Sequence, residues 1–271
     1  MVAGNVVEDR APDGSWVPGG PSLYSARAAA ALGARVTLLT RLTPGYDRAV
    51  LDGLDVRPIP AASLPRYANS YDAGGRRTQL LLSPGEPLDA ALPLEAPADA
   101  LLVAPAYHEF GALPVIPARL LAVCYQGILR AADGSGRVLP AAEPATATLP
   151  FSAPGSFAFF SDEDTADPDE LARTIAGRGV TVFLTRGARG ATLFRDGTAA
   201  SFAALPASPV DPTGAGDCFA AAFMVRFAES RSIETATQFA LAAAALSVEG
   251  EGLAALPARA EVELRLARAA A

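Results

Sequence analysis

The stretch 209-PVDPTGAGDCFAAAF-223 joins a glycine-rich turn to the start of an apolar, alanine-rich helix. Gly214, Ala215 and Gly216 are small enough to let a ligand approach the backbone, and the first N–H groups of the helix have no intrahelical partner. Because the helix dipole adds partial positive charge at the same point, the turn favours a phosphate or a developing negative charge. Asp217 falls within the first helical turn, where an acid either complements the dipole or takes part in chemistry.

The chain on either side of this stretch alternates short β-rich runs with helix-period runs, which is typical of βαβ units and a mostly parallel sheet. The apolar runs are short enough to be strands covered on both faces of the sheet. We expect strands at 2–7, 35–40, 100–105, 120–124, 157–160 and 180–185, and helices at 21–33, 214–229, 233–248 and from about 258.

Two segments depart from this alternation. Residues 10–19 lie outside it, and 69-NSYDAGGRRTQLLL-82 predicts a β-hairpin that turns at Gly74–Gly75. We therefore expect one domain over residues 1–271, with a small β lid formed by about 10–19 and 66–83.

Composition excludes several classes of function. The formal charge is -7 and the pI is about 4.8, which argues against a nucleic-acid or anionic-membrane partner. All 22 basic residues are Arg, so a catalytic Lys, a Schiff base and a P-loop Lys are excluded. One histidine and two distant cysteines offer no zinc cluster and no disulfide framework. We expect a cytoplasmic protein without a secretory leader or a membrane span.

The motif DPTGAGD (211–217) resembles the C-terminal signature of the ribokinase/PfkB family of carbohydrate and nucleoside kinases. Other stretches resemble the family in the same order: GNVVED (4–9), PGGPSLYSARAAAALGARVTLLT (18–40), TRGARGATLF (185–194) and FALAAAALSVEGEG (239–252). QGILRAADGSGRV (126–138) is similar to the branch that includes plant-type myo-inositol kinases. The resemblance implies a ribokinase-like three-layer α/β/α sandwich with a mostly parallel central sheet and a small β lid.

The resemblance also implies an activity. An ATP-dependent kinase would transfer the γ-phosphate to a hydroxyl of a sugar or polyol, with myo-inositol or a related cyclitol as the best match. Asp217 would be the general base, the turn of Gly214, Ala215 and Gly216 the anion hole, and Mg²⁺ the counter-charge on the phosphates. The alternatives are a nucleoside kinase on the same fold, in which Tyr24 would stack on the base, and a sugar or nucleotide sensor without turnover.

Family positions extend this implied site to further residues. Those expected at the substrate are Asp9, Gly19, Gly20, Tyr24, His108, Gln126 and Arg130. Those expected at the nucleotide are Ser161, Thr185, Arg186, Gly187, Arg189, Gly190 and Leu241. Simpler interpretations stay open: a tight turn for the two glycines, a structural histidine for His108, and surface charge for Arg76 and Arg77 beside the hairpin.

The chain departs from the family pattern at three positions. Tyr24 stands where many sugar kinases have Asn, Ser161 and Asp164 replace Asn-x-x-Glu, and Cys124 replaces an Asp. Asp164 is therefore either a magnesium ligand or part of an acidic loop, and Cys124 and Cys218 are expected to be small buried residues.

Two further expectations come from the family. The counterparts of Asp211 and Thr213 often help to bind a monovalent cation such as K⁺, whereas Asp211 alone would cap the turn. Members that use the cation usually complete that site with a Ser that GEGLAALP (250–257) lacks. A lid with free edges often pairs in this family, which implies a homodimer.

Overall fold

A computed structural model describes residues 1–11, 13–71, 77–88 and 97–269. Its large sheet has nine strands in the order β15-β14-β13-β12-β9-β8-β1-β4-β5. The strands are β1 (Val2–Ala3), β4 (Thr37–Leu42), β5 (Asp55–Pro60), β8 (Leu101–Val103), β9 (Leu121–Cys124), β12 (Phe157–Ser161), β13 (Thr181–Thr185), β14 (Ala191–Arg195) and β15 (Thr198–Phe202). From β5 to β13 every pairing is parallel, and β14 and β15 add an antiparallel edge. The expected fold class, a ribokinase-like α/β sandwich, is confirmed.

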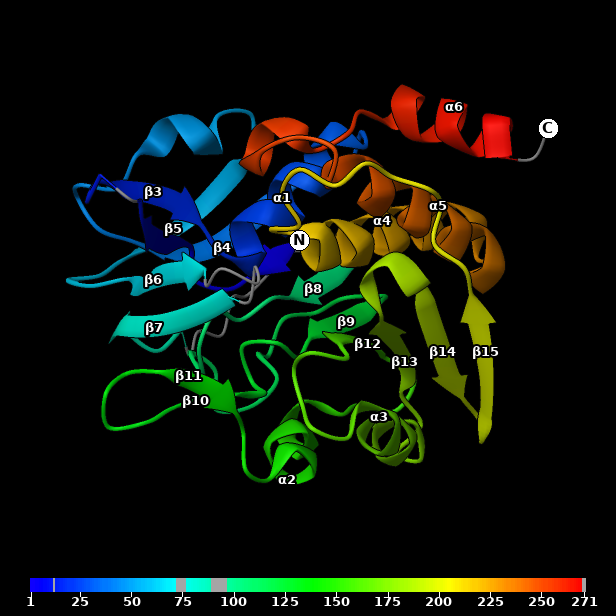
Figure 1. The fold of residues 1–271 in the computed structure, drawn as a ribbon, viewed down its shortest axis with the longest axis horizontal. Coiled ribbons are helices and arrows are strands. Elements are labelled where there is room, and N and C mark those ends of the chain that lie inside the picture. The colour runs from blue at the N-terminus through cyan, green and yellow to red at the C-terminus, as the bar shows by residue number, and fades with distance from the viewer. Residues whose placement is uncertain (12, 72–76, 89–96, 270–271) are drawn as a thin grey trace.

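Helices cover both faces of this sheet, which explains why its strands are continuously apolar (Figure 1). On one face lie α1 (Pro21–Ala31), α4 (Ala215–Ser230) and α5 (Ile233–Ser247), with α6 (Arg259–Ala269) beside them; on the other lie α2 (Pro144–Thr148) and α3 (Pro168–Ala176). Phe157 and Phe159 of β12 enter the first core, whereas Ala158 and Phe160 enter the second. Alternate side chains of β12 therefore pack against the two helical layers on opposite faces of the sheet.

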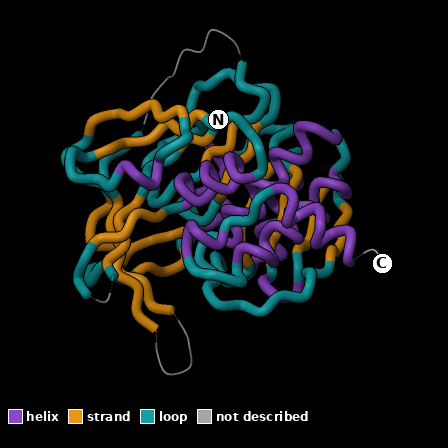
Figure 2. Tube along the Cα trace, turned by 90° about the horizontal axis from the view of Figure 1, so that it is seen from above, coloured by secondary structure: helices purple, strands orange, loops and turns teal. Residues whose placement is uncertain are grey.

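A separate small sheet has the strand order β3-β2-β6-β7. It consists of β2 (Val7–Arg10), β3 (Trp16–Gly19), β6 (Pro65–Tyr71) and β7 (Arg77–Pro84). A short hairpin of β10 (Arg130–Ala132) and β11 (Val138–Pro140) meets β7 through a bridge between Leu80 and Arg137. Figure 2 shows these strands at the side of the helical layer. The antiparallel pairing of β6 with β7 confirms the expected hairpin, while Gly74, Gly75 and Arg76 lie outside the described residues.

The first predicted strand, residues 2–7, is wrong in one respect: it is two strands in two sheets. β1 ends at Ala3 and β2 begins at Val7, so the chain crosses from the large sheet to the small one between them. A Cβ on Gly4 would overlap the carbonyl of Ala104, and the amide of Asn5 donates to the Glu109 carboxylate at 2.8 Å instead of to a neighbouring strand. This crossing places Asp9 in the small sheet.

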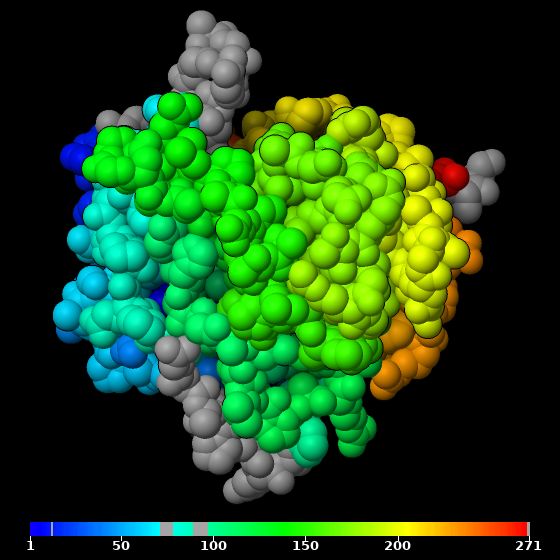
Figure 3. Space-filling view, turned by 90° about the horizontal axis from the view of Figure 1, so that it is seen from below, coloured from blue at the N-terminus to red at the C-terminus, as the bar shows by residue number. Residues whose placement is uncertain are grey.

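The edge strands β5 and β15 and the β10–β11 hairpin had no clear sequence signal. β5 contains two prolines, which an edge strand tolerates because one side needs no ladder hydrogen bonds. Figure 3 looks onto the face formed by α2, α3 and their neighbouring loops, drawn in green to yellow. Within the described ranges, every helix is too short or too polar to cross a membrane.

Candidate active site

Gly214 adopts a conformation that other residues rarely take. It is the N-cap of α4, with φ 77° and ψ 3°, and the helix begins at Ala215, one residue after the expected start. A Cβ at position 214 would also overlap the ring of Tyr24, which reaches this turn from α1. Both the backbone angle and the lack of space therefore require glycine here.

The ring of Tyr24 lies among three of the predicted acids. The residue is 7% exposed, and burial raises the pKa of its hydroxyl to about 12, with the charges of Asp211, Asp9 and Asp217 acting in the same direction. These acids come from a loop, the small sheet and α4. Tyr24 thus marks the point at which three distant segments converge.

Asp217 carries a strongly perturbed carboxyl group. The residue is half-buried, but its carboxyl group is packed among protein atoms, and this burial raises its pKa to about 7. The charge of Arg130 lowers that pKa and the charge of Asp164 raises it. A carboxyl group with a pKa near neutral pH in the first turn of a helix suits a general base.

Asp164, Gln126 and Arg130 come together beside Asp217. Asp164 accepts a 2.7 Å hydrogen bond from the amide of Ser161, and the Gln126 side chain donates to its carboxyl group. Burial raises the pKa of Asp164, and Arg130 opposes that shift. These residues follow β12 and β9, so the ends of neighbouring strands build the cluster.

Arg130 is held by its surroundings. Its guanidinium lies 5.5 Å from the centre of the Tyr67 ring and donates to the carbonyl of Ala106 at 3.4 Å. His108, with φ 49°, places its Nε2 2.5 Å from the carbonyl oxygen of Arg130. The structure thus gives the exposed His108 a contact at the backbone of Arg130, and its role at the substrate stays a prediction.

Asp9 lies in β2 of the small sheet. Its Oδ1 accepts a hydrogen bond from the Asn69 amide at 3.3 Å, and Asn69 accepts one from Gln79 at 3.0 Å. An added Cβ on Gly19 would stand 2.5 Å from Asp9 Oδ2, so Gly19 makes room for this carboxylate. Sequence reasoning missed Asn69 and Gln79, although both lie in the predicted hairpin.

Gly20 precedes α1 with φ 96°, and a Cβ there would collide with Val7. Its conformation is that of a tight turn between β3 and α1, and its role at the substrate stays a prediction.

The predicted nucleotide loop follows β13. Thr185 ends that strand opposite Ser161, the last residue of β12, and Gly187 and Gly190 both have positive φ angles. Arg186 pairs with Asp169 at 2.8 Å and also donates to Thr192. Arg189 pairs with Asp162. Both arginines of the loop are thus tied to acids near the end of β12 and the start of α3.

Leu241 lies within α5 and is buried in the helical core. Its contact with a nucleotide stays a prediction.

Asp211 connects the glycine turn to a second loop. Its Oδ1 accepts from the Thr213 amide at 2.9 Å and its Oδ2 from the Gly252 amide at 3.1 Å. This is the capping role that the sequence left open for Asp211, and it brings residue 252 beside the turn.

Two thiols lie next to the acids but are poor nucleophiles. Cys124 and Cys218 are buried and free, and burial raises both pKa values, that of Cys218 to about 12. They act as small apolar residues, as expected.

Glu109 is a buried acid that the sequence did not single out. Its carboxylate accepts hydrogen bonds from the amides of Asn5, Ala106 and Tyr107 at 2.7–2.8 Å, while burial raises its pKa. It fixes the chain where β1 and β8 leave the large sheet.

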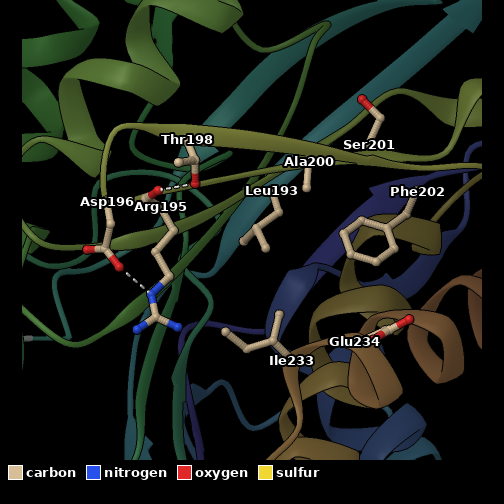
Figure 4. A pocket seen from close by; sticks show the side chains of 9 residues that line it. All are labelled: Leu193, Arg195, Asp196, Thr198, Ala200, Ser201, Phe202, Ile233 and Glu234. Atoms are coloured by element: carbon tan, nitrogen blue, oxygen red, sulfur yellow. Dashed lines mark hydrogen bonds and ion pairs between the residues drawn. The ribbon is translucent and has the colours of Figure 1, made fainter.

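A cavity of about 540 Å³ lies elsewhere, between the β14–β15 hairpin and the start of α5 (Figure 4). Its wall includes the ion pair of Arg195 with Asp196. Phe194 pairs with Val182 near the beginning of β13, whereas the predicted site residues lie at the other end of that strand. This cavity contains none of the predicted site residues.

Parts of the chain are similar in sequence to known kinases. A family model described as pfkB family carbohydrate kinase matches residues 148–259. The chain is 43% identical to ribokinase of Bacillus subtilis over 83 residues, 30% of this chain and 28% of that protein. It is 38% identical to cytidine kinase of Thermococcus kodakarensis over 79 residues, 28% of each chain. The matched stretches thus span little more than a quarter of these relatives.

Solved structures extend the similarity to the whole fold. A pyrophosphate-dependent myo-inositol-1 kinase variant has a TM-score of 0.74 at 21% identity, covering 99% of both chains. Ribokinase of Arabidopsis thaliana, in complex with ribose and ATP, has a TM-score of 0.68 at 20% identity, covering 98% of this chain and 97% of that one. The match to the pfkB family carbohydrate kinase model thus covers the region that holds Asp217, and the solved structures show a ribokinase-like fold over the whole chain.

Proposed function

We propose that the protein is a phosphotransferase that moves the γ-phosphoryl group of ATP to a hydroxyl of a sugar or polyol. The observation that carries this proposal is the position of Asp217. Its carboxyl group has a pKa of about 7, stands in the first turn of a helix and is flanked by Arg130 and Asp164. A base and an anion-binding helix start therefore occur within three residues.

The backbone amides of the turn are not equally available to a phosphate. The Ala215 amide already donates to the Pro212 carbonyl at 3.3 Å. Gly216 and Asp217 belong to the first turn, whose N–H groups have no intrahelical partner. We infer that the amides of Gly216 and Asp217 stabilise the transferring phosphoryl group, and that Gly214 sets their direction.

In the proposed phosphoryl transfer, one bond to the γ-phosphorus forms while another breaks. Asp217 accepts the proton of the substrate hydroxyl while the hydroxyl oxygen forms a bond to the γ-phosphorus and the bond to the ADP oxygen breaks. The proton ends on Asp217, and ADP leaves with the electron pair. Arg130 stabilises the ionised carboxylate before transfer.

Carboxylate oxygens suited to Mg²⁺ are present beside Asp217. Mg²⁺ prefers carboxylates and phosphates, and a site that uses the donor's own phosphates needs few protein ligands. Asp164 is the residue that would hold the ion, which when bound would neutralise phosphate charge. Asp211 and Thr213 would hold K⁺ in the same proposal, tested by comparing rates in potassium and tetramethylammonium buffers.

For the acceptor we favour a cyclitol such as myo-inositol. The amide–carboxylate chain from Gln79 through Asn69 to Asp9 offers donors and acceptors to several hydroxyls. The nucleoside alternative used Tyr24 to stack on a base, and that ring instead lies buried under Gly214. A nucleoside kinase remains the second candidate because cytidine kinase is among the relatives.

A panel assay tests the proposal. ADP release with Mg-ATP is measured for myo-inositol, pentoses, hexoses and nucleosides, and pyrophosphate replaces ATP in a parallel series because a structural neighbour is pyrophosphate-dependent. Turnover with a polyol that is lost in Asp217→Asn supports the proposal. ATP binding without release for any acceptor would point to a sensor.

The proposal includes a cytoplasmic homodimer that pairs through the small sheet, which carries Asp9 and serves as a lid. Trp16, Leu80 and Leu82 of that sheet are large apolar residues that stay exposed. Light scattering after gel filtration measures the mass in solution, and a monomer would remove this part of the proposal.

A further inference from the structure

A second cavity lies behind the small sheet, on the face opposite to Asp9. Glu8 and Asp9 are neighbours in β2, and successive side chains of a strand point to opposite faces. Asp9 faces Asn69, whereas Glu8 faces a cavity of about 350 Å³, a volume within the range of about 300–1,000 Å³ for small-molecule sites. Its polar and aromatic wall consists of Glu8, Trp16, Thr43, Tyr46, Asp47 and Arg66.

Tyr46 in this wall has a buried hydroxyl with no hydrogen-bond partner among the described residues. The residue is 4% exposed, and burial raises the pKa of its hydroxyl, with the charges of Glu8, Asp47 and Asp9 adding to the effect. An unsatisfied buried polar group destabilises the folded state, so folding alone gives no reason to keep this hydroxyl.

The charged side chains of the cavity wall already have hydrogen-bond partners in the protein. Arg66 donates to Glu8 Oε2 through both Nε and Nη2 at 2.7 Å, and its guanidinium lies 4.5 Å from the centre of the Trp16 ring. Asp47 accepts the amide of Ala49 at the start of a short helix. Because the Arg66 guanidinium is already paired with Glu8, the cavity attracts a free anion only weakly.

The remaining features match a neutral ligand with several hydroxyls. Tyr46 and Thr43 offer hydroxyls, the carboxylates offer acceptor oxygens, and Trp16 with Pro18 offers apolar surface. A polyol supplies donors and acceptors on every hydroxyl and C–H faces between them.

We propose that this cavity is a second binding site, for a small sugar or cyclitol, that is separate from the phosphotransfer site. A ligand there would connect β2 and β6, through Glu8 and Arg66, to the loop after β4 that carries Thr43 and Tyr46. Asp9 lies on the same strand as Glu8, so occupancy would bias the position of Asp9. The inference does not depend on catalysis.

Trp16 lies in the cavity wall and provides an intrinsic fluorescence probe, because it is the single tryptophan of the chain. We would titrate myo-inositol and D-ribose, separately, against Trp16 fluorescence in the full-length protein. The expected result is a saturable change that persists in Asp9→Asn, which disables the other face of the sheet. In Tyr46→Phe the affinity should fall about tenfold, as expected for one lost hydrogen bond to a ligand.

Tyr125→Phe is the matched control. It also removes one buried phenolic hydroxyl, but that hydroxyl bonds to Phe151 and Ser152 away from the cavity. Its polyol affinity should equal that of the wild type, although its thermal stability should fall. Tyr46→Phe should keep or raise thermal stability, so weaker binding there would not reflect unfolding.

Three results would overturn the proposal. The first is no fluorescence change with either polyol, and the second is a change that disappears in Asp9→Asn or persists unaltered in Tyr46→Phe. The third is a change produced by KCl or ethylammonium chloride but by neither polyol, which would identify a cation site instead.

Discussion

The ring of Tyr24 occupies the space in which a side chain at position 214 would stand. The first turn of α4, and with it Asp217, is therefore positioned by a residue almost two hundred positions earlier in the chain. Many members of the family have Asn at the position of Tyr24. In this chain the buried ring of Tyr24 packs against the turn at Gly214.

Replacing Gly214 with Ala tests this relationship. The φ of 77° and the overlap with Tyr24 should lower the free energy of unfolding by about 1–3 kcal/mol. Gly216→Ala is the control, because a Cβ there meets nothing within 4 Å and alanine favours a helix. Thermal unfolding should show a loss for the first variant and no loss for the second; equal melting temperatures would contradict the packing argument.

Activity should depend on pH through Asp217. The base must be ionised to accept a proton, so kcat/KM should fall as the pH drops through an apparent pKa of about 7. The measurement is kcat/KM from pH 5 to 9 at saturating Mg-ATP. A rate that is level down to pH 5 would show that Asp217 is not the titrating base.

Two neighbours of Asp217 should move this profile in opposite directions. Arg130→Gln removes the charge that lowers the pKa of Asp217, so the acid limb should shift to higher pH. Asp164→Asn removes the charge that raises it, so the limb should shift to lower pH. Shifts of the same sign in both variants would be inconsistent with these electrostatic roles, whatever happens to the maximal rate.

The buried carboxyl group of Asp217 should also cost stability. Its pKa is about 7 in the folded chain against the ordinary value of 3.8 for an aspartate, so the native state retains a proton that the unfolded state releases. The contribution of protonated Asp217 to the free energy of unfolding is therefore fully present below about pH 4 and is lost as the pH rises through 7. Discounted for partial solvent access, Asp217→Asn should be about 1–3 kcal/mol more stable at pH 8 and equal at pH 4. Urea unfolding at both pH values measures this.

Glu109 should matter for folding more than for chemistry. Glu109→Gln replaces one carboxylate oxygen with an NH₂ group, which cannot accept the amides of Asn5, Ala106 and Tyr107 equally well. We expect a loss of about 2–4 kcal/mol, since buried amides lose a charged acceptor. A melting temperature equal to that of the wild type would show that the neutral side chain suffices.

The sequence by itself determined the features that depend on local pattern. Apolar runs of strand length alternating with helix-period runs gave a mostly parallel sheet covered by helices, and DPTGAGD placed an acid at a helix start. The hairpin of β6 and β7 was also predictable from its turn residues. Within one segment, periodicity and turn chemistry carry enough information to define an element.

Only the tertiary structure decided how these elements meet. It divided residues 2–7 between two sheets, because Glu109 takes the amide at which the first strand would have continued. It set Tyr24 beneath Gly214 and Arg130 near Asp217, and it left the hydroxyl of Tyr46, beside Glu8, without a hydrogen-bond partner in the part of the chain that the structure describes. Such relationships join residues far apart in the chain, and their energies depend on distance and burial, which no local pattern records.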